Sequence, residues 1–239
     1  MYKLELHMHS EGVSLCSDCS IEYALERYKK AGYQGVVLTN HINNGTYRDN
    51  QDLPWPQKVD YFMADYYKMK ELAGEDFDVL LGCEINLTPI SPDYQNGYIP
   101  NDYLVYGVTE EWLRDAGDVR LDKLDVLSRK VHDAGMLFVH AHQFRYNTRI
   151  SKDEYFDGYE VYNANDSHDS HDALADLWAI MKHKIRTSGS DFHHPNSTIA
   201  GGIETQERVR DNETLLRVLR SGNYELLRPD AACASFYLK

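Results

Sequence analysis

Two histidines stand two residues apart near the start of the chain, in the stretch LELHMHSEG at residues 4–12. Apolar and polar side chains alternate there, which predicts a β-strand. His7 and His9 then point to the same side of that strand, about 7 Å apart along the backbone. Two imidazoles at this spacing can share one metal ion, and metal binding is therefore the chemistry that the stretch suggests.

Other side chains suited to metal binding follow other expected strands. Glu84 ends LLGCE at residues 80–84, and Asp191 opens SDFHH at residues 190–194. One histidine at a strand end is more often structural, but many on one rim favour zinc, iron or manganese held by imidazole and carboxylate. The histidines at expected strand ends are His7, His9, His41, His140, His142, His193 and His194.

The elements that must position these residues alternate between strand and helix. Crossover-length helices between strands indicate a parallel sheet, open or closed into a barrel, and so an α/β fold. The carboxyl ends of parallel strands share one rim, where the histidines would converge. The expected strands are 4–9, 35–41, 78–87, 102–108, 136–142, 159–165 and 185–194 with its exit; the expected helices are 20–32, about 58–72, 121–135, 170–184 and 212–222.

Composition limits the possible classes of protein. The 239 residues contain no Pro/Gly/Ser-rich linker, so we expect a single domain over residues 1–239. No apolar run approaches the roughly 18 residues of a membrane span, and no signal peptide is evident, so a cytoplasmic protein is expected. A formal charge of −13 argues against long nucleic acids as partners. Small phosphorylated substrates remain compatible, since bound cations can reverse the local field.

Several common catalytic motifs are missing from the sequence. No strand is followed by GxGxxG or GxxxxGK[ST], and GxSxG is absent as well. The four cysteines are too few for a disulfide scaffold. Cys16 and Cys19 form a lone CxxC, which suits a redox pair or half a zinc site, but a pair of loop thiols is the simpler interpretation.

Five short motifs together carry a resemblance to a known family. HMHS, LTNH, GCE, AHQFR and GSDFHH resemble, in order, the HxHS/T, TDH, GxE, AHPFR and GSDxH motifs of the PHP (polymerase and histidinol phosphatase) family. The resemblance spans residue 4 to about residue 230. It implies a distorted (β/α)7 barrel with two or three divalent metal ions, zinc, manganese or iron, at the carboxyl rim.

The resemblance also assigns roles to individual residues. Arg145, which ends AHQFR, is a candidate for gripping phosphate oxygens. Asp191 and His193 are candidates both for metal binding and for proton transfer. Carried over by motif, the metal ligands are His7, His9, His41, Glu84, His142, Asp191 and His193.

Three positions depart from the family pattern. The aspartate expected about five residues after HxH is Ser14, and Glu11 or Asp18 would have to replace it, with Glu11 preferred. The aspartate of TDH is Asn40. The histidine expected on the strand after GxE is absent, and either Asp102 or Tyr103 falls at its position. Of these two residues, Asp102 could still bind a metal through a carboxylate oxygen.

The function that the resemblance implies is a metal-dependent phosphoesterase. It would hydrolyse a small phosphomonoester or a nucleotide-like substrate with metal-activated water. Two alternatives stay open: an amidohydrolase-type enzyme that attacks carbon, and a non-catalytic metal-binding PHP module. The oligomeric state cannot be inferred from the sequence.

Overall fold

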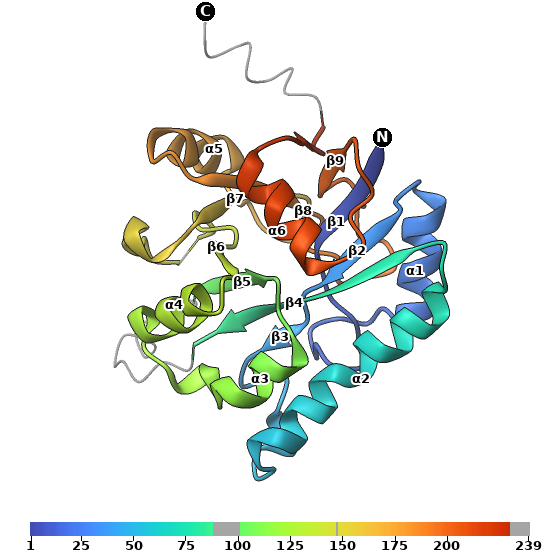
Figure 1. Ribbon diagram of the computed structural model, residues 1–239, viewed down its shortest axis with the longest axis vertical. Coiled ribbons are helices and arrows are strands. Elements are labelled where there is room, and N and C mark those ends of the chain that lie inside the picture. The colour runs from blue at the N-terminus through green and yellow to red at the C-terminus, as the bar shows by residue number, and fades with distance from the viewer. Residues whose placement is uncertain (88–100, 147, 230–239) are drawn as a thin grey trace, which may run out of the picture.

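The computed structural model describes residues 1–87, 101–146 and 148–229 (Figure 1). Strands and helices alternate through most of this part of the chain. The strands are β1 (Tyr2–Met8), β2 (Gly35–Leu38), β3 (His41–Ile42), β4 (Asp78–Asn86), β5 (Asp102–Tyr106), β6 (Leu137–His140), β7 (Gly158–Asn163), β8 (Ile185–Gly189), β9 (Ile203–Thr205) and β10 (Glu225–Leu226). The helices are α1 (Ile21–Lys30), α2 (Trp55–Ala73), α3 (Glu110–Ala116), α4 (Leu124–Asp133), α5 (Asp172–Met181) and α6 (Asn212–Ser221).

The sheet curves into a nearly closed barrel, which confirms the expected fold class. Its strand order is β10-β9-β1-β2-β4-β5-β6-β7-β8, and β3 pairs with β4 beside this path. The segment after β8 returns to β1, because Met8 and Phe192 form a parallel bridge and the amide of His9 donates to the Phe192 carbonyl at 3.0 Å. β1, β2 and β4 to β8 thus make the seven barrel strands, and the ends of β1 and β8 meet.

One barrel strand runs against the others, contrary to the expected parallel sheet. β5 pairs antiparallel with both β4 and β6, and Asn86 at the end of β4 lies opposite Asp102 at the start of β5. The amino end of β5 therefore lies at the rim that receives the carboxyl ends of its neighbours. Asp102 reaches this rim because the strand is reversed.

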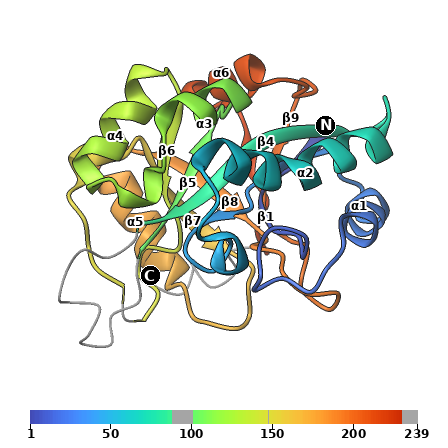
Figure 2. The same cartoon turned by 90° about the horizontal axis from the view of Figure 1, so that it is seen from below.

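The helices pack around the outside of the strands, and α1 and α2 lie along one flank (Figures 1 and 2). α1 begins where the expected cap stands, since the Ser20 hydroxyl accepts from the Tyr23 amide at 3.3 Å. Its buried face contains Ile21, Ala24, Leu25 and Tyr28 and covers β1 and β2. This burial of the apolar face holds the strands, and the rim loops that follow them, in register.

Some elements were not expected from the sequence. The short helix α3 is capped by Thr109, whose hydroxyl accepts from the Trp112 amide at 3.1 Å. β9 and β10 are two or three residues long and extend the sheet beyond β1. In the part of the chain that is described, every helix is too short or too polar to cross a bilayer.

Candidate metal centre

Glu84 lies at the centre of the histidine-rich rim, at the end of β4. Its carboxylate is buried and lies within 3.4 Å of four imidazoles. Oε1 is 3.3 Å from Nε2 of both His7 and His142. Oε2 is 3.0 Å from His41 Nδ1 and 3.4 Å from His9 Nε2. The end of β1, the start of β3 and the segment after β6 therefore deliver four imidazoles to one carboxylate.

Asp191, just beyond β8, forms the second carboxylate of the centre. Its Oδ1 is 3.2 Å from His9 Nε2 and 3.3 Å from His193 Nδ1. Its Oδ2 accepts hydrogen bonds from the side-chain amides of Asn163 at 3.3 Å and Asn165 at 3.1 Å. One oxygen is thus held by amides while the other faces the imidazoles, which fixes the carboxylate for metal binding.

The buried Glu160 on β7 orients His7 from behind. Glu160 Oε1 lies 2.8 Å from His7 Nδ1, so the imidazole turns Nε2 toward the centre. Glu160 Oε2 accepts from the His142 amide at 3.1 Å and from Asn163 at 2.9 Å. A carboxylate behind a ligand histidine fixes its tautomer and raises its basicity. Sequence reasoning missed Glu160; its signal is a charged residue inside the buried strand GYEVYN.

The electrostatics of the centre require positive charge. Burial opposes ionisation of Glu84 and Asp191, yet the facing imidazoles, His7 foremost, hold the pKa of both carboxyls well below its usual value. Burial likewise works against a charged His7, but Glu160, Asp191 and Glu84 raise its pKa well above normal. The pKa of His9 is well below normal because of burial and its neighbours His193 and His41. Protonated imidazoles or bound cations must balance these carboxylates.

The residues present fit divalent metal ions. Buried atoms with no hydrogen-bond partner among the described residues include His7 Nε2, His9 Nε2, His41 Nδ1 and Glu84 Oε1. Buried polar atoms normally have partners, so these four mark a site built for a ligand. Ligand atoms lie within 4.8 Å of one another in three groups: His9, His41 and His193; His7, His9 and Asp191; and Glu84, Asp102 and His142.

Arg145 and Asp102 lie beside each other at the edge of the centre. Arg145 Nη2 is 3.9 Å from Asp102 Oδ2, which in turn lies 3.9 Å from His142 Nε2. Arg145 Nε is buried and has no hydrogen-bond partner within the described ranges. Both residues therefore lie beside His142 at the edge of the metal centre. A cavity of about 240 Å³ opens there, lined by Cys16, His41, Glu84, His142, Arg145, Asn165, Ser167, His168, Asp191, His193 and His194.

The structure does not bring Glu11 to the metal centre. Glu11 is exposed and, among the residues described, belongs to none of the three ligand groups. The alternative, Asp18, pairs instead with His194, whose Nδ1 is 2.7 Å from Asp18 Oδ1. The Ser14 hydroxyl instead makes hydrogen bonds around the centre: it donates to Asn40 Oδ1 at 2.9 Å, accepts from the His41 amide at 3.0 Å and lies 3.4 Å from His9 Nδ1. Asn40 therefore keeps a hydrogen-bonding role at this position.

Cys16, in the loop that follows β1, lines the same cavity as His41 and His193. Burial raises the pKa of this thiol, but the two imidazoles outweigh burial and lower the pKa to about 6. Cys19 differs: it is buried in the apolar core, and burial raises the pKa of its thiol to about 12. Sequence reasoning treated the two thiols alike.

His140 ends β6, two residues before His142, but its side chain lies outside the metal centre. Its ring packs against Phe156 at 4.9 Å and Tyr103 at 5.1 Å between centroids. Burial lowers its pKa to about 3, so the imidazole is neutral at physiological pH. His140 is therefore a core residue.

Two ligand positions need unusual backbone conformations. Asp191 has φ 48° and His142 has φ 25°, both in the left-handed region. Close approach also restricts Gly189, where a Cβ would lie 2.3 Å from His7 Cβ. The absence of a side chain at Gly189 thus lets β8 approach β1 and brings Asp191 to the HxH pair.

Comparison with known proteins agrees with this geometry. The family model described as PHP domain matches residues 5–198. No significantly similar sequence was found among curated proteins. A search of solved structures found similar folds at low sequence identity, which supports the fold alone.

Three solved structures illustrate this similarity. A two-domain protein from Bacteroides vulgatus, described as containing a predicted PHP-like metal-dependent phosphoesterase, has a TM-score of 0.63 at 14% identity, over 94% of this chain and 64% of that one. A lesion-specific endonuclease from Pyrococcus furiosus has a TM-score of 0.61 at 15% identity, over 94% and 57%. An amidohydrolase from Chromobacterium violaceum has a TM-score of 0.53 at 14% identity, over 96% and 99%. The chain thus spans about two thirds or less of the first two proteins.

Proposed function

Because this chain belongs to the PHP domain family, we propose that it is a metal-dependent phosphoesterase that hydrolyses a small phosphorylated or nucleotide-like substrate, with residues 1–239 acting as one catalytic domain. The observation that carries the proposal is the cluster around Glu84, in which buried imidazole nitrogens without hydrogen bonds lie beside the unpaired Arg145 Nε. A cation site next to a guanidinium group that has unused donors suits a phosphate ester.

The metal ligands in this proposal are His7, His9, His41, Glu84, Asp102, His142, Asp191 and His193. Two or three zinc, manganese or iron ions bound there would activate water as the nucleophile and offset charge on the phosphoryl oxygens. Glu160 keeps Nε2 of His7 directed inward, and Asn163 and Asn165 hold Asp191 in place. These residues preorganise the centre before substrate arrives.

In this proposal, Arg145 binds the substrate and His193 exchanges a proton with it. Arg145 lines the cavity and would donate from its guanidinium to phosphoryl oxygens, a bidentate contact that also orients the ester. His193 Nδ1 lies 2.9 Å from the Asp191 carbonyl, which holds a proton on Nδ1 and leaves Nε2 to accept one. Because Nε2 is the one nitrogen left for either role, His193 would bind a metal or transfer a proton, but not both at once.

The cavity volume favours a small substrate over a long one. About 240 Å³ admits a phosphoryl group and part of its alcohol, and the chain is acidic overall. The endonuclease with a similar fold is described as lesion-specific, so hydrolysis of an oligonucleotide by this chain would contradict the preference for a small substrate.

Elemental analysis combined with a hydrolysis screen tests the proposal. The purified protein, with added Mn²⁺, Zn²⁺ or Fe²⁺, is expected to hold two or more metals per chain and to release phosphate from monoesters or diesters. His9→Ala and Asp191→Ala should lose both properties, whereas His183→Asn, at the other end of β8, should keep them.

Three results would go against the proposal. Metal without phosphate release, together with hydrolysis of amides or lactones, would point to the amidohydrolase-type reaction. Metal without any hydrolysis would point to a non-catalytic binding module. Absence of metal in every preparation would mean that the histidine rim has another role.

A further inference from the structure

Glu5 on β1 is a fully buried carboxylate that accepts hydrogen bonds from two strands. Its Oε1 accepts from the backbone amides of Leu6 at 3.0 Å, His7 at 2.9 Å and Ser190 at 2.8 Å. Its Oε2 accepts from the Tyr28 hydroxyl at 3.1 Å. Leu6 and His7 belong to β1, whereas Ser190 directly follows β8. One oxygen atom therefore joins the two strands between which the barrel closes.

The seam between β1 and β8 is held differently from the other strand pairs. β8 ends the strand order, and no ladder pairs it with β1 among the described residues. At the rim, the Phe192 amide donates to the His7 carbonyl at 3.4 Å, and the His9 amide donates to the Phe192 carbonyl at 3.0 Å. Deeper in the barrel, the bond from Ser190 to Glu5 joins the two strands. The Glu5 side chain thus takes the place of a ladder hydrogen bond at the seam.

The seam also separates metal ligands that must face each other. His7 and His9 lie on one side of it, and Asp191, the residue after Ser190, lies on the other. Asp191 Oδ1 is 3.4 Å from His7 Nε2 and 3.2 Å from His9 Nε2. A hydrogen bond to an ionised acceptor is shorter and about twice as strong as one between neutral groups. The carboxylate of Glu5 is therefore suited to fix the width of the seam next to these ligands.

We propose that Glu5 is a positioning residue that sets the separation between Asp191 and the imidazoles of His7 and His9, and thereby the affinity of the centre for divalent metal. Among the described residues, Glu5 belongs to none of the three groups of ligand atoms, and it acts through the backbone. It differs in this from Glu160, which contacts a ligand side chain. The inference rests on the proposed metal-dependent function.

Glu5→Gln tests this role, because the amide keeps the size of the side chain and removes its charge. We expect the variant to bind Zn²⁺ or Mn²⁺ roughly 10- to 100-fold more weakly in competition with a chelator. In the metal-free protein, hydrogen exchange should become faster at the amides of Leu6, His7 and Ser190 while the other strands keep their protection.

Tyr28→Phe is the matched control. It removes a buried hydrogen bond to the same carboxylate but leaves the three amide bonds in place, so it should keep the metal affinity of the unaltered protein. A loss of stability alone would affect both variants alike. If Glu5→Gln does not fold, Glu5→Asp replaces it: the shorter side chain keeps the charge but cannot reach across the seam, and the same local changes are expected.

The outcomes separate this inference from the proposed function. Unchanged metal affinity in the folded Glu5 variant would overturn the positioning role and leave the metal-dependent function intact. Equal losses of affinity in the Glu5 variant and in Tyr28→Phe, with faster exchange throughout the barrel, would reduce Glu5 to a stabilising residue and overturn the role as well. Failure of the unaltered protein to bind any divalent metal would overturn the proposed function, and this inference with it.

Discussion

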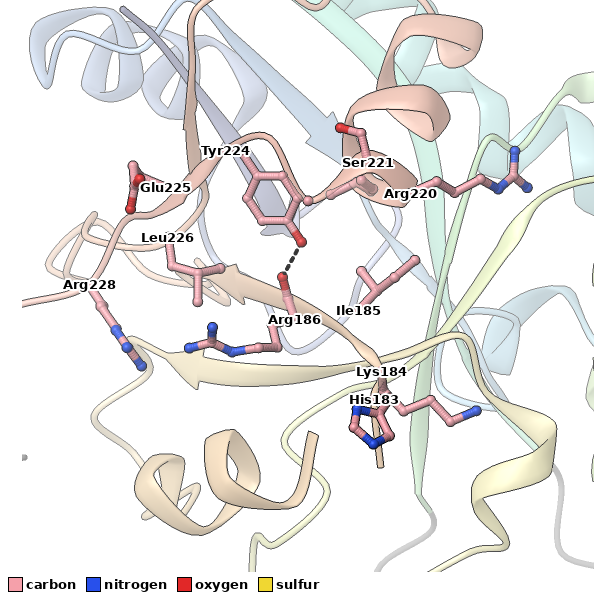
Figure 3. A pocket seen from close by; sticks show the side chains of 12 residues that line it. His183, Lys184, Ile185, Arg186, Arg220, Ser221, Tyr224, Glu225, Leu226 and Arg228 are labelled. Carbon is pink, nitrogen blue, oxygen red and sulfur yellow. Dashed lines mark hydrogen bonds between the residues drawn. The ribbon is translucent and has the colours of Figure 1, made fainter. Parts of the chain in front are cut away.

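Two cavities lie at opposite ends of β8, and they differ in whether their polar and charged side chains have hydrogen-bond partners. The rim cavity, about 240 Å³, follows the carboxyl end of β8. A larger cavity of about 440 Å³ lies at the amino end of β8 and contains Lys184, Arg186, Arg220 and Arg228 (Figure 3). Volume and positive charge alone would favour the larger cavity as the functional site.

The hydrogen bonds favour the smaller cavity as the functional site. In the larger cavity Arg186 and Arg228 bind the two oxygens of Asp176 at 2.6 and 2.8 Å, and Arg220 donates to the Gly135 carbonyl at 2.6 Å. Lys184 donates to the Phe156 carbonyl at 2.5 Å. These cations support the fold. Around Glu84 the imidazole nitrogens lack such partners, so unmet bonding capacity distinguishes the functional cavity from the structural one.

The largest expected effect comes from Glu84→Gln. The variant keeps the shape of the side chain but removes the charge that faces four imidazoles. We expect metal content to fall and phosphate release to drop by roughly 10³-fold or more. Elemental analysis with steady-state kinetics measures both. Full activity in this variant would show that the rim cavity is not the functional one.

Glu160→Gln should have the next largest effect. The amide would no longer hold His7 Nδ1 as a carboxylate does, so we expect a 10- to 100-fold loss of metal affinity. Competition with a chelator measures this loss, and added metal should restore most of the activity. An unchanged affinity would limit Glu160 to a packing role.

Arg145→Lys is expected to act on substrate rather than on metal. Lysine keeps the charge but cannot make a bidentate contact, so KM for a phosphomonoester should rise by about 10-fold while the metal content stays constant. Kinetics with elemental analysis separates the two effects. A loss of metal instead would place Arg145 among the residues that support Asp102.

Asp176→Asn, which removes the charge that pairs with Arg186 and Arg228 of the larger cavity, should change stability alone. Burial raises the pKa of Asp176, but Arg186 and Arg228 outweigh burial and lower it below its ordinary value of 3.8. The stabilisation is therefore present above about pH 4 and lost as pH falls through the lowered pKa. We expect the variant to lose about 1 kcal/mol at neutral pH, because the pairs are partly exposed.

Chemical denaturation at several pH values tests this expectation. The difference between Asp176→Asn and the unaltered protein should be constant near neutrality and shrink below pH 4. Metal content and hydrolysis should not change. If either fell, the larger cavity would also contribute to function, and the contrast between the two cavities would fail.

Much of the fold could be predicted from the sequence because its signals are local. Alternating side chains predicted β1, and apolar spacing with a capping serine predicted α1. The reversed direction of β5 and the short β9 could not be predicted, since strand pairing depends on partners far away in the sequence.

The candidate site was predictable where motifs mark it. His7, His9 and Asp191 stand in recognisable stretches, and the structure places Asp191 Oδ1 3.4 Å from His7 Nε2 and 3.2 Å from His9 Nε2. Cys16 was missed because its position depends on bonds between its loop and His193, more than 170 residues later. Glu160 was missed because it acts from behind His7.

The left-handed backbone conformation at Asp191 determines how substitutions at this position affect stability and activity. Non-glycine residues in that region cost about 1 kcal/mol or more relative to relaxed backbone, and the buried carboxylates of Asp191 and Glu84 both lie within 3.4 Å of His7 Nε2. Substitutions that relax this position can therefore yield a protein that survives heating better and has lost its chemistry. Selection for thermal tolerance alone would tend to erase Asp191, and only selection for activity would retain it.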